Sequence, residues 1–438
     1  MNQPWLSKQK LPSYVIENVE MWSDSSLTSN VSVVVENGCF AAGLSSPEQS
    51  SLPKIDGQGL VLMPAGVDAQ THLRVPGQAH KETPETGLLA ALRGGYAALL
   101  TMPNTQPTLD SVEVLLRGQS EVLPFEQEFG VQVFWSAAIT KKLNSNDLTG
   151  FEALVEAGVR AFTNDGLGVE SDEVMEQAFA RLEKLPVPLL QHAEFAGHGG
   201  CLAPGPIQRR VGASPYPDEP EWKMVERDLR ILRRYPKARY HVLHVSSRRT
   251  LEFVRSAKRE GLRVTAEVSP HHLFFNTETI DPKNLAFKMN PPIRSPEDQQ
   301  ALWAALSDGT LDFVATDHAP HEELMKSGEF NKAAFGTLGL ETTLSVLAHG
   351  LRKGFLTPQR LVQVFATAPA QFLNVSGGLG RFEKGKPFHG VLFDPLAAER
   401  VYSADSIASL SKNSCFIGAR LPGRILKAFH GASVFTFK

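Results

Sequence analysis

The sequence predicts an α/β protein in which a (β/α)8 TIM barrel is joined to a small β-sandwich domain built from both termini. Three observations support this fold class. Eight short apolar runs recur between residues 60 and 317, longer segments with helical periodicity separate them, and both ends of the chain contain alternating strand-like runs instead. A chain of 438 residues is long enough for one large barrel with a smaller domain beside it.

The eight apolar runs have the composition of parallel strands that are buried on both faces. The segments between them, such as VEVLLRGQSEVL and DEVMEQAFARLEKL, carry apolar residues at three- and four-residue intervals, which is typical of helices. A doubly wound sheet would alternate in the same way and is the alternative fold. The runs are LVLMPAGVDA, YAALLTMP, VQVFWSAA, VRAFTN, VPLLQHA, RYHVLHV, LRVTAEV and LDFVATD.

The two ends of the chain are expected to pair with each other. Residues 12–60 contain SYVIENVEM and SVVVENGCFAAG, and residues 388–438 contain GVLFDP and AFHGASVFTF, all with the alternation of strands. We therefore predict that residues 1–60 form the N-terminal part of the β-domain, residues 61–375 the barrel, and residues 376–438 the C-terminal part of the β-domain.

Composition argues against several classes of partner. Hydrophobic residues make up 42% of the chain and charged residues 21%, and no apolar run is long enough to cross a membrane. The net charge of -3 leaves no excess of basic residues for nucleic acid. The N-terminal sequence lacks the apolar stretch of a secretory signal, so a cytoplasmic location is expected.

Polar residues gather where the predicted strands end. The carboxyl ends of barrel strands share one mouth, where enzymes with this fold place their active sites. Imidazoles and carboxylates together suit Zn²⁺ or a similar divalent ion. A single buried histidine is more often a hydrogen-bonded core residue, but the common position at strand ends favours a metal site. The polar residues at or just after the ends of the predicted strands are Gln70, His72, Asn104, Asp165, His192, His244, His271, His272 and Asp317.

Nine longer stretches of the chain contain all of these residues except Gln70. They are HLRVPGQAHKETPETG, TMPNTQPTLD, AFTNDGLGV, LLQHAEFAG, HVLHVSS, VTAEVSPHHLFF, KMNPPIRSPED, ATDHAPHEE and FGTLGLETTL. In this order they resemble the successive blocks of the bacterial class I dihydroorotases, in the amidohydrolase superfamily. The resemblance extends from about residue 60 to the C-terminal SKNSCFIGARLPGR, and it implies a barrel of the metal-dependent hydrolase type.

The resemblance implies a metal-dependent cyclic amidohydrolase. The family reaction is the reversible cyclisation of N-carbamoyl-L-aspartate to (S)-dihydroorotate and water, in the de novo biosynthesis of pyrimidines (UMP). One metal would be held by His72 and Asp317 and the other by His192 and His244, with Asp165 bridging the two. Asp317 would also be the catalytic acid and base.

The resemblance also implies a set of substrate-binding residues. Residues 321–336 would form a mobile flap over the site. The substrate would contact Arg74, Asn104, Asn290, His321, Phe335 and Gly336. A planar guanidinium such as that of Arg74 suits a carboxylate, because it can bind both oxygens.

The sequence departs from the family pattern at Gln70, which stands in place of the first histidine of the His-x-His motif. An amide oxygen is a weak, neutral ligand that suits hard cations better than zinc. Gln70 is therefore a weaker candidate ligand, and we expect one or two Zn²⁺ ions per chain with one site weakened. Asn164 and Val75 also replace acidic residues that the family commonly has.

Two other functions remain open at this point. Because the His-x-His motif is altered at Gln70, the chain could be an inactive paralogue that serves as a structural partner of aspartate carbamoyltransferase. It could also be another cyclic-amide hydrolase, an allantoinase or hydantoinase, although Asp165 stands where hydantoinases carry a carboxylated lysine. Five of the six ligand positions are retained, which favours dihydroorotase. A homodimer is a family-based expectation.

Overall fold

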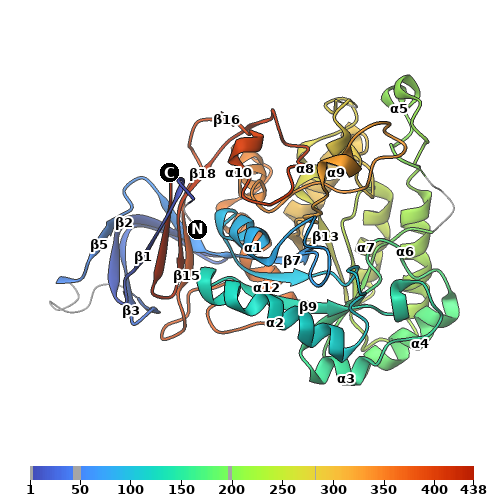
Figure 1. Cartoon of the computed structure of the whole chain (residues 1–438), viewed down its shortest axis with the longest axis horizontal. Helices are drawn as coiled ribbons and strands as arrows, with labels where there is room; N and C mark the ends of the chain where they lie inside the picture. Colours follow the sequence, from blue (N-terminus) through green and yellow to red (C-terminus); the bar gives the residue numbers. More distant parts are fainter. Residues whose placement is uncertain (1–2, 43–50, 196–199, 282) are drawn as a thin grey trace.

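The computed structural model describes residues 3–42, 51–195, 200–281 and 283–438, and a closed parallel barrel lies at its centre (Figure 1). Within these residues, eight parallel strands pair in unbroken chain order. A parallel bridge between Thr71 and His318 closes the sheet. This order confirms the predicted barrel, since a doubly wound sheet reverses its strand order. The strands are β7 (Gly66–Thr71), β8 (Tyr96–Thr101), β9 (Gln132–Ala137), β10 (Val159–Thr163), β11 (Leu189–Gln191), β12 (Tyr240–Val242), β13 (Val264–Val268) and β14 (Phe313–Val314).

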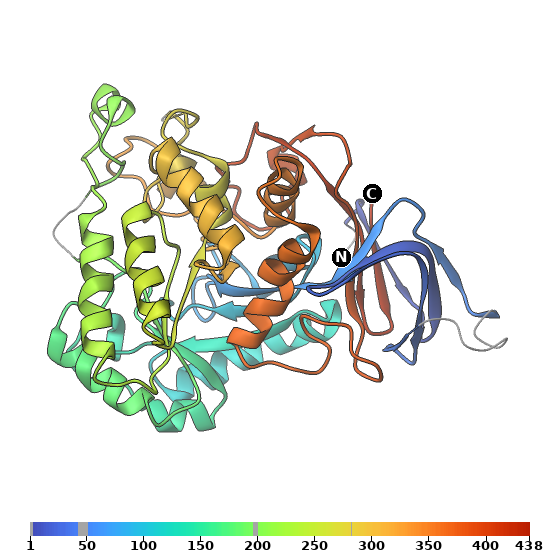
Figure 2. The same cartoon turned by 180° about the vertical axis from the view of Figure 1, so that it is seen from behind.

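Helices cover the outside of the barrel in both views (Figures 1 and 2). Ser111, Ser171 and Ser295 each begin a helix by accepting a backbone N–H with the side-chain oxygen, which satisfies one of the unpaired donors of the first turn. No helix in the described part of the chain is both long and apolar enough to span a membrane. The helices are α1 (Pro84–Arg93), α2 (Val112–Phe129), α3 (Phe151–Glu156), α4 (Asp172–Leu182), α5 (Pro206–Val211), α6 (Glu219–Leu232), α7 (Arg248–Arg259), α8 (Pro270–Phe274), α9 (Pro296–Asp308), α10 (Thr343–Arg352), α11 (Pro358–Val362) and α12 (Ala368–Phe372).

The first predicted strand is in fact two strands that belong to different sheets. Its first half, β6 (Val61–Pro64), pairs with β15 (His389–Asp394) outside the barrel, and its second half is β7. Both halves are fully buried, so the apolar pattern continues across the change of sheet. Hydrophobic periodicity therefore could not reveal the break. The division of the chain at residues 60 and 375 stays a prediction.

The second sheet combines strands from both ends of the chain, as predicted. Within the described residues nine strands take part, and β1 lies antiparallel to β19, so the two chain ends are neighbours (Figure 1). Tyr14 of β2 stacks on Phe429 of β18, with 5.8 Å between ring centroids, in a second apolar core. Besides β6 and β15, the strands are β1 (Leu6–Lys10), β2 (Tyr14–Trp22), β3 (Leu27–Glu36), β4 (Cys39–Ala42), β5 (Lys54–Asp56), β18 (Arg424–His430) and β19 (Ser433–Phe437).

A buried carboxyl group connects the barrel to the C-terminal part of the chain. Glu341, just before α10, accepts the N–H of Ala408 with both oxygens, at 3.0 and 3.1 Å. Its Oε1 lies 3.6 Å from Nε of Arg93. Burial raises the pKa of Glu341 to about 7, although Arg93 and the backbone N–H groups favour the ionised form. The folded protein therefore keeps a proton on Glu341 at pH values where the unfolded chain has lost it.

Replacing Glu341 by glutamine removes this proton linkage. Between about pH 5 and pH 7 the folded wild type binds more protons at this position than the unfolded chain, so its stability relative to Glu341→Gln should fall as pH rises, by about 1.4 kcal/mol per pH unit. Melting temperatures of both proteins from pH 5 to 8 test this. A difference between them that does not change with pH would contradict the expectation.

Candidate active site

A cavity of about 210 Å³ opens at the carboxyl ends of the barrel strands. The structure brings every predicted substrate-contacting and metal-ligating residue except Gln70 to the wall of this cavity, together with Gly166 and Ala319, which the sequence analysis did not select. The cavity is lined by His72, Arg74, Asn104, Asp165, Gly166, His192, His244, Asn290, Asp317, Ala319, His321, Phe335 and Gly336. His271 and His272 are buried in α8 and do not line it.

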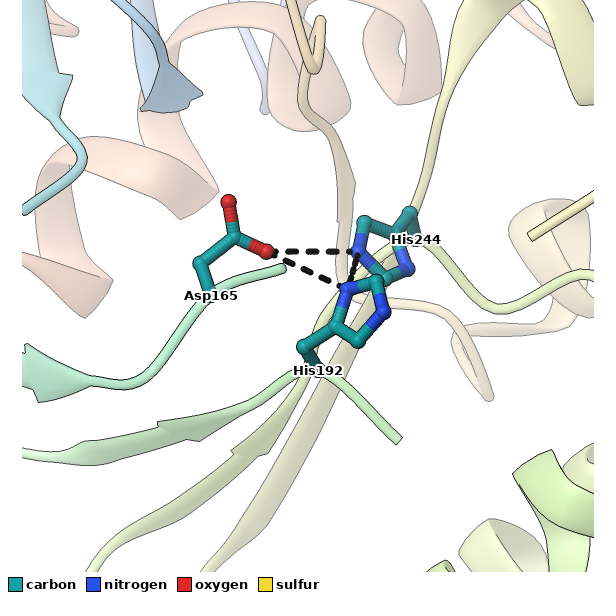
Figure 3. A group of neighbouring side chains, drawn as sticks. All are labelled: Asp165, His192 and His244. Atoms are coloured by element: carbon teal, nitrogen blue, oxygen red, sulfur yellow. Dashed lines mark hydrogen bonds and ion pairs between the residues drawn. The ribbon is translucent and has the colours of Figure 1, made fainter. Parts of the chain in front are cut away.

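Asp165, His192 and His244 form the first group of donor atoms (Figure 3). Nδ1 of His192 lies 2.9 Å from Nε2 of His244, and Oδ1 of Asp165 lies 3.3 and 3.6 Å from these two nitrogens. All three side chains are almost completely buried. Two imidazoles and a carboxylate converging on one point fit a divalent ion such as zinc.

The orientation of His192 is set from behind by a residue that the sequence analysis missed. Nε2 of His192 lies 3.2 Å from Oε2 of Glu194, and Asn290 donates to the same carboxylate at 2.7 Å. This contact turns Nδ1 of His192 toward Asp165, as carboxylates behind metal-binding histidines do. Glu194 stands two residues after His192 in LLQHAEFAG, and this spacing was the available signal.

The second group of donor atoms shares Asp165 with the first. Nε2 of His72 lies 3.1 Å from Oδ2 of Asp165 and 3.2 Å from Oδ1 of Asp317. The other ring nitrogen of His72 is 2.8 Å from Oδ1 of Asn104, which fixes the ring. The two oxygens of Asp165 thus face different groups, Oδ1 toward His192 and His244 and Oδ2 toward His72. This arrangement fits two neighbouring cations joined by one carboxylate.

Gln70 lies buried beside the shared carboxylate. Its Nε2 donates to Oδ1 of Asp165 at 3.3 Å, while its buried Oε1 has no hydrogen-bond partner among the described residues. An unpaired amide oxygen next to two groups of ligands is chemically suited to a cation, because leaving it unpaired costs about 1–3 kcal/mol. Gln70 thus adds a neutral oxygen where the resemblance led us to expect an imidazole.

The carboxylates of the site strongly favour positive charge nearby. Burial alone would lower the pKa of His72, but hydrogen bonds with Asp165 and Asp317 outweigh it and raise the pKa to about 9. Burial also lowers the pKa of His192, but hydrogen bonds with Asp165 and Glu194 outweigh this effect and raise the pKa to about 10. The pKa of Asp165 lies well below its usual range, because hydrogen bonds from the histidines outweigh burial. The site therefore suits a cation.

Three residues of the site have left-handed backbone conformations, with φ of 60° at Arg74, 32° at His244 and 47° at Asp317. A non-glycine residue in this region costs on the order of 1–3 kcal/mol and persists only where the surroundings hold it. The N–H of Asp317 donates to the carbonyl of Gln70 at 3.0 Å, which ties the eighth strand end to the first. With this backbone conformation, all three residues line the cavity at the mouth of the barrel.

Arg74 supplies a buried cation at the wall of the cavity. Its Nη2 lies 3.2 Å from Nε2 of His321, and its Nε donates to the carbonyl of Pro320 at 3.2 Å. Burial, together with the charge of Arg74, lowers the pKa of His321 to about 2, so this imidazole is neutral. The ring accepts from Arg74 through Nε2 and can donate its remaining N–H to a carboxylate ligand without adding charge.

Residues 321–336, the predicted flap, form an irregular loop with a short 3₁₀ turn at Glu323–Lys326. Lys326 donates to the backbone carbonyls of Lys288, Ala334 and Gly336 at 2.8 to 3.0 Å, which fixes the fold of this loop. Phe335 lines the cavity and has the ammonium group of Lys288 4.5 Å from its ring centroid. The mobility of the loop stays a prediction.

Comparisons with known proteins identify relatives of the chain. Residues 59–250 match the family model described as Dihydro-orotase-like. The chain is 38% identical to a dihydroorotase from Listeria welshimeri over 92% of its length and 94% of the relative. It is 36% identical to a dihydroorotase from Elusimicrobium minutum, over 96% of this chain and 97% of that one. These matches extend over nearly the whole of both relatives.

Solved structures share the fold. The L-hydantoinase (dihydropyrimidinase) from Arthrobacter aurescens has a TM-score of 0.83 at 23% identity, covering 96% of this chain and 95% of that chain. A D-hydantoinase (dihydropyrimidinase) from Thermus sp. has a TM-score of 0.80 at 21% identity, with coverage of 96% and 94%. Fold and site define a TIM-barrel amidohydrolase. On the strength of its sequence relatives, the chain belongs to the dihydroorotase-like family.

The contact behind His192 can be tested by replacing Glu194 with glutamine. This substitution keeps the shape but removes the charge that orients the imidazole, so affinity for Zn²⁺ should fall by roughly 10- to 100-fold. Titration with zinc against a competing chelator measures this affinity. The exposed Glu156, changed to glutamine in parallel, is the control, and equal affinities in both variants would contradict the assignment.

Proposed function

We propose that this protein is a dihydroorotase of class I that catalyses the reversible, metal-assisted cyclisation of N-carbamoyl-L-aspartate to (S)-dihydroorotate and water. The observation that carries the proposal is the shared Asp165, with a group of metal donors on each of its oxygens and the buried guanidinium of Arg74 in the same cavity. Family membership at 36–38% identity supports the same reaction.

The proposed metal is Zn²⁺. His72, Asp165 and Asp317 would hold one ion, and Asp165, His192 and His244 would hold the other. When bound in such a site, zinc polarises the reacting carbonyl and lowers the pKa of water to about 7. We propose that Gln70 replaces a histidine of the His-x-His motif and makes the ion at His72 the weaker of the two.

The organic part of the substrate would be held by side chains that line the same cavity. Arg74 would bind the carboxylate of the substrate through two N–H groups, and His321 would add one hydrogen bond from its neutral ring. Asn104 and Asn290 would hold the same carboxylate, and the backbone around Phe335 and Gly336 would line the pocket. These contacts fix the reacting carbonyl beside Asp317, which is worth much of the rate enhancement.

Asp317 would move the proton. In the hydrolytic direction its carboxylate accepts a proton from the attacking water, and the bond between the ring carbonyl carbon and the amide nitrogen breaks. Asp317 then delivers the proton to the departing nitrogen. In the cyclising direction the same carboxyl group takes the proton from the attacking ureido nitrogen and gives it to the leaving oxygen. Its contact with His72 keeps it directed into the cavity.

Several further features remain predictions of the same proposal. They are the homodimer, the association with aspartate carbamoyltransferase, the cytoplasmic location and the division into domains at residues 60 and 375. The inactive paralogue is the second candidate function, and Gln70 is the observation in its favour. An assay of the purified protein for dihydroorotate hydrolysis and formation, with zinc supplied, separates the two candidates.

Replacing Asp317 by asparagine should abolish turnover, because the amide cannot accept the proton. We expect kcat to fall by about 10²- to 10⁴-fold, measured as dihydroorotate hydrolysis with zinc in excess. Asp147→Asn, at an aspartate whose side chain is 77% exposed, is the matched control and should behave as the wild type does. Appreciable activity in Asp317→Asn would assign the proton transfer to another group.

Replacing Gln70 by histidine tests whether the altered ligand weakens one metal site. An imidazole here should raise the zinc content after dialysis toward two ions per chain and increase affinity for the second ion. Elemental analysis and zinc titration measure both. Gln70→Leu, which has no ligand atom, should lower the content, and if all three proteins retain zinc equally, position 70 takes no part in metal binding.

A further inference from the structure

A segment from the far C-terminal part of the chain lies against the mouth of the barrel. We call residues 408–415 the C-terminal strap. Ser409 and Leu410 contact the buried carboxylate of Glu82, which lies 3.5 Å from Nε2 of His318, next to Asp317. The backbone carbonyl of Asn413 accepts hydrogen bonds from Thr337 Oγ1 at 3.2 Å and the Leu338 N–H at 3.3 Å. The strap thus lies beside both loops that complete the cavity.

Asn413 makes the most complete contact between the strap and these loops. Its Oδ1 accepts the N–H of His321 at 3.0 Å, and its Nδ2 donates to the carbonyls of Ala319 at 3.0 Å and Gly336 at 3.2 Å. Both amide protons and the amide oxygen are therefore used. Only 7% of the residue is exposed, so water cannot replace these bonds without opening the structure.

The three backbone groups that Asn413 holds all belong to residues lining the cavity. Ala319 and His321 follow Asp317 in the loop after β14, and Gly336 comes from the other side of the flap loop. The two loops also meet directly, since the N–H of Ala319 donates to the carbonyl of Thr337 at 2.9 Å. Asn413 adds the contact that fixes the backbone of His321, and thereby its 3.2 Å approach to Arg74.

The strap does not touch the donor atoms at the other side of the site. Among the described residues, the side chains of His192 and His244 form hydrogen bonds or ion pairs with Asp165, Glu194, Asn290 and each other. Loss of the Asn413 amide should therefore disturb the wall that holds the substrate and leave that metal group in place. If Asn413 contributed only to general stability, its loss would disturb the substrate-binding wall and the metal group alike.

We propose that Asn413 is a positioning residue that sets the substrate-binding wall at Ala319, His321 and Gly336 through its side-chain amide. This role in catalysis rests on the proposed function. Asn413 touches none of the reacting atoms and acts through the backbone of the residues that do. Through Asn413, the C-terminal strap supports the wall of the substrate pocket without lining it.

The test compares Asn413→Ala and Asn413→Ser with wild type and with Ser411→Ala. Ser411 lies in the same segment, and its hydroxyl donates to the carbonyl of Lys81, so it is the matched control. Asn413→Ser keeps a small polar group and serves if the alanine variant does not fold. We expect KM for dihydroorotate to rise about tenfold or more, with zinc content unchanged. Ser411→Ala should stay within about twofold of wild type.

Hydrogen–deuterium exchange provides a readout independent of turnover. Peptides covering residues 317–322 and 334–338 should exchange faster in the Asn413 variants, and those containing Asp165 and His244 should not change. If the wild type is inactive but exchange rises only in these loops, the contact stands and the proposed function fails. If the wild type is active and a folded Asn413 variant keeps wild-type KM, kcat and exchange, the positioning role is wrong.

Discussion

The site depends on one carboxylate that serves two groups of ligands. Asp165 directs Oδ1 to His192 and His244 and Oδ2 to His72, and no other side chain of the described cavity is in contact with both groups. In a buried site such a carboxylate is tolerated only with positive charge on both sides. Histidine protons or divalent cations can supply that charge, and the lowered pKa of Asp165 reflects this demand. The ligands of both groups are arranged around that requirement.

The fold meets this requirement by bringing distant strand ends together. The bridge between Thr71 and His318 closes the barrel, which carries His72 and Asp317 to within 3.2 Å of each other. The left-handed backbone at Arg74, His244 and Asp317 then turns side chains inward that an extended strand would direct elsewhere. The barrel and the contacts around it hold these residues in the left-handed conformation. The geometry of the site therefore depends on the whole fold.

Much of this arrangement could be predicted from the sequence. Barrel strands end at a common mouth, so His192, His244 and Asp317 could be brought together without knowledge of any contact. The break between β6 and β7 could not be predicted, since both strands are buried and no polar residue separates them. The contacts of Asn413 depend on tertiary packing between segments distant in sequence, which neither periodicity nor strand-end position encodes. Glu194 lies only two residues after His192, and that spacing was a signal the sequence offered. Gln70 could be identified as a departure, but its contact with Asp165 required the structure.

The central claim is that Asp165 joins two cation sites. Anomalous X-ray diffraction at the zinc edge, from crystals grown with zinc, tests it most directly. Two peaks are expected, one on each side of Asp165, with the peak near His72 and Gln70 the weaker. Two peaks that share no ligand, or no peak in contact with Asp165, would contradict it.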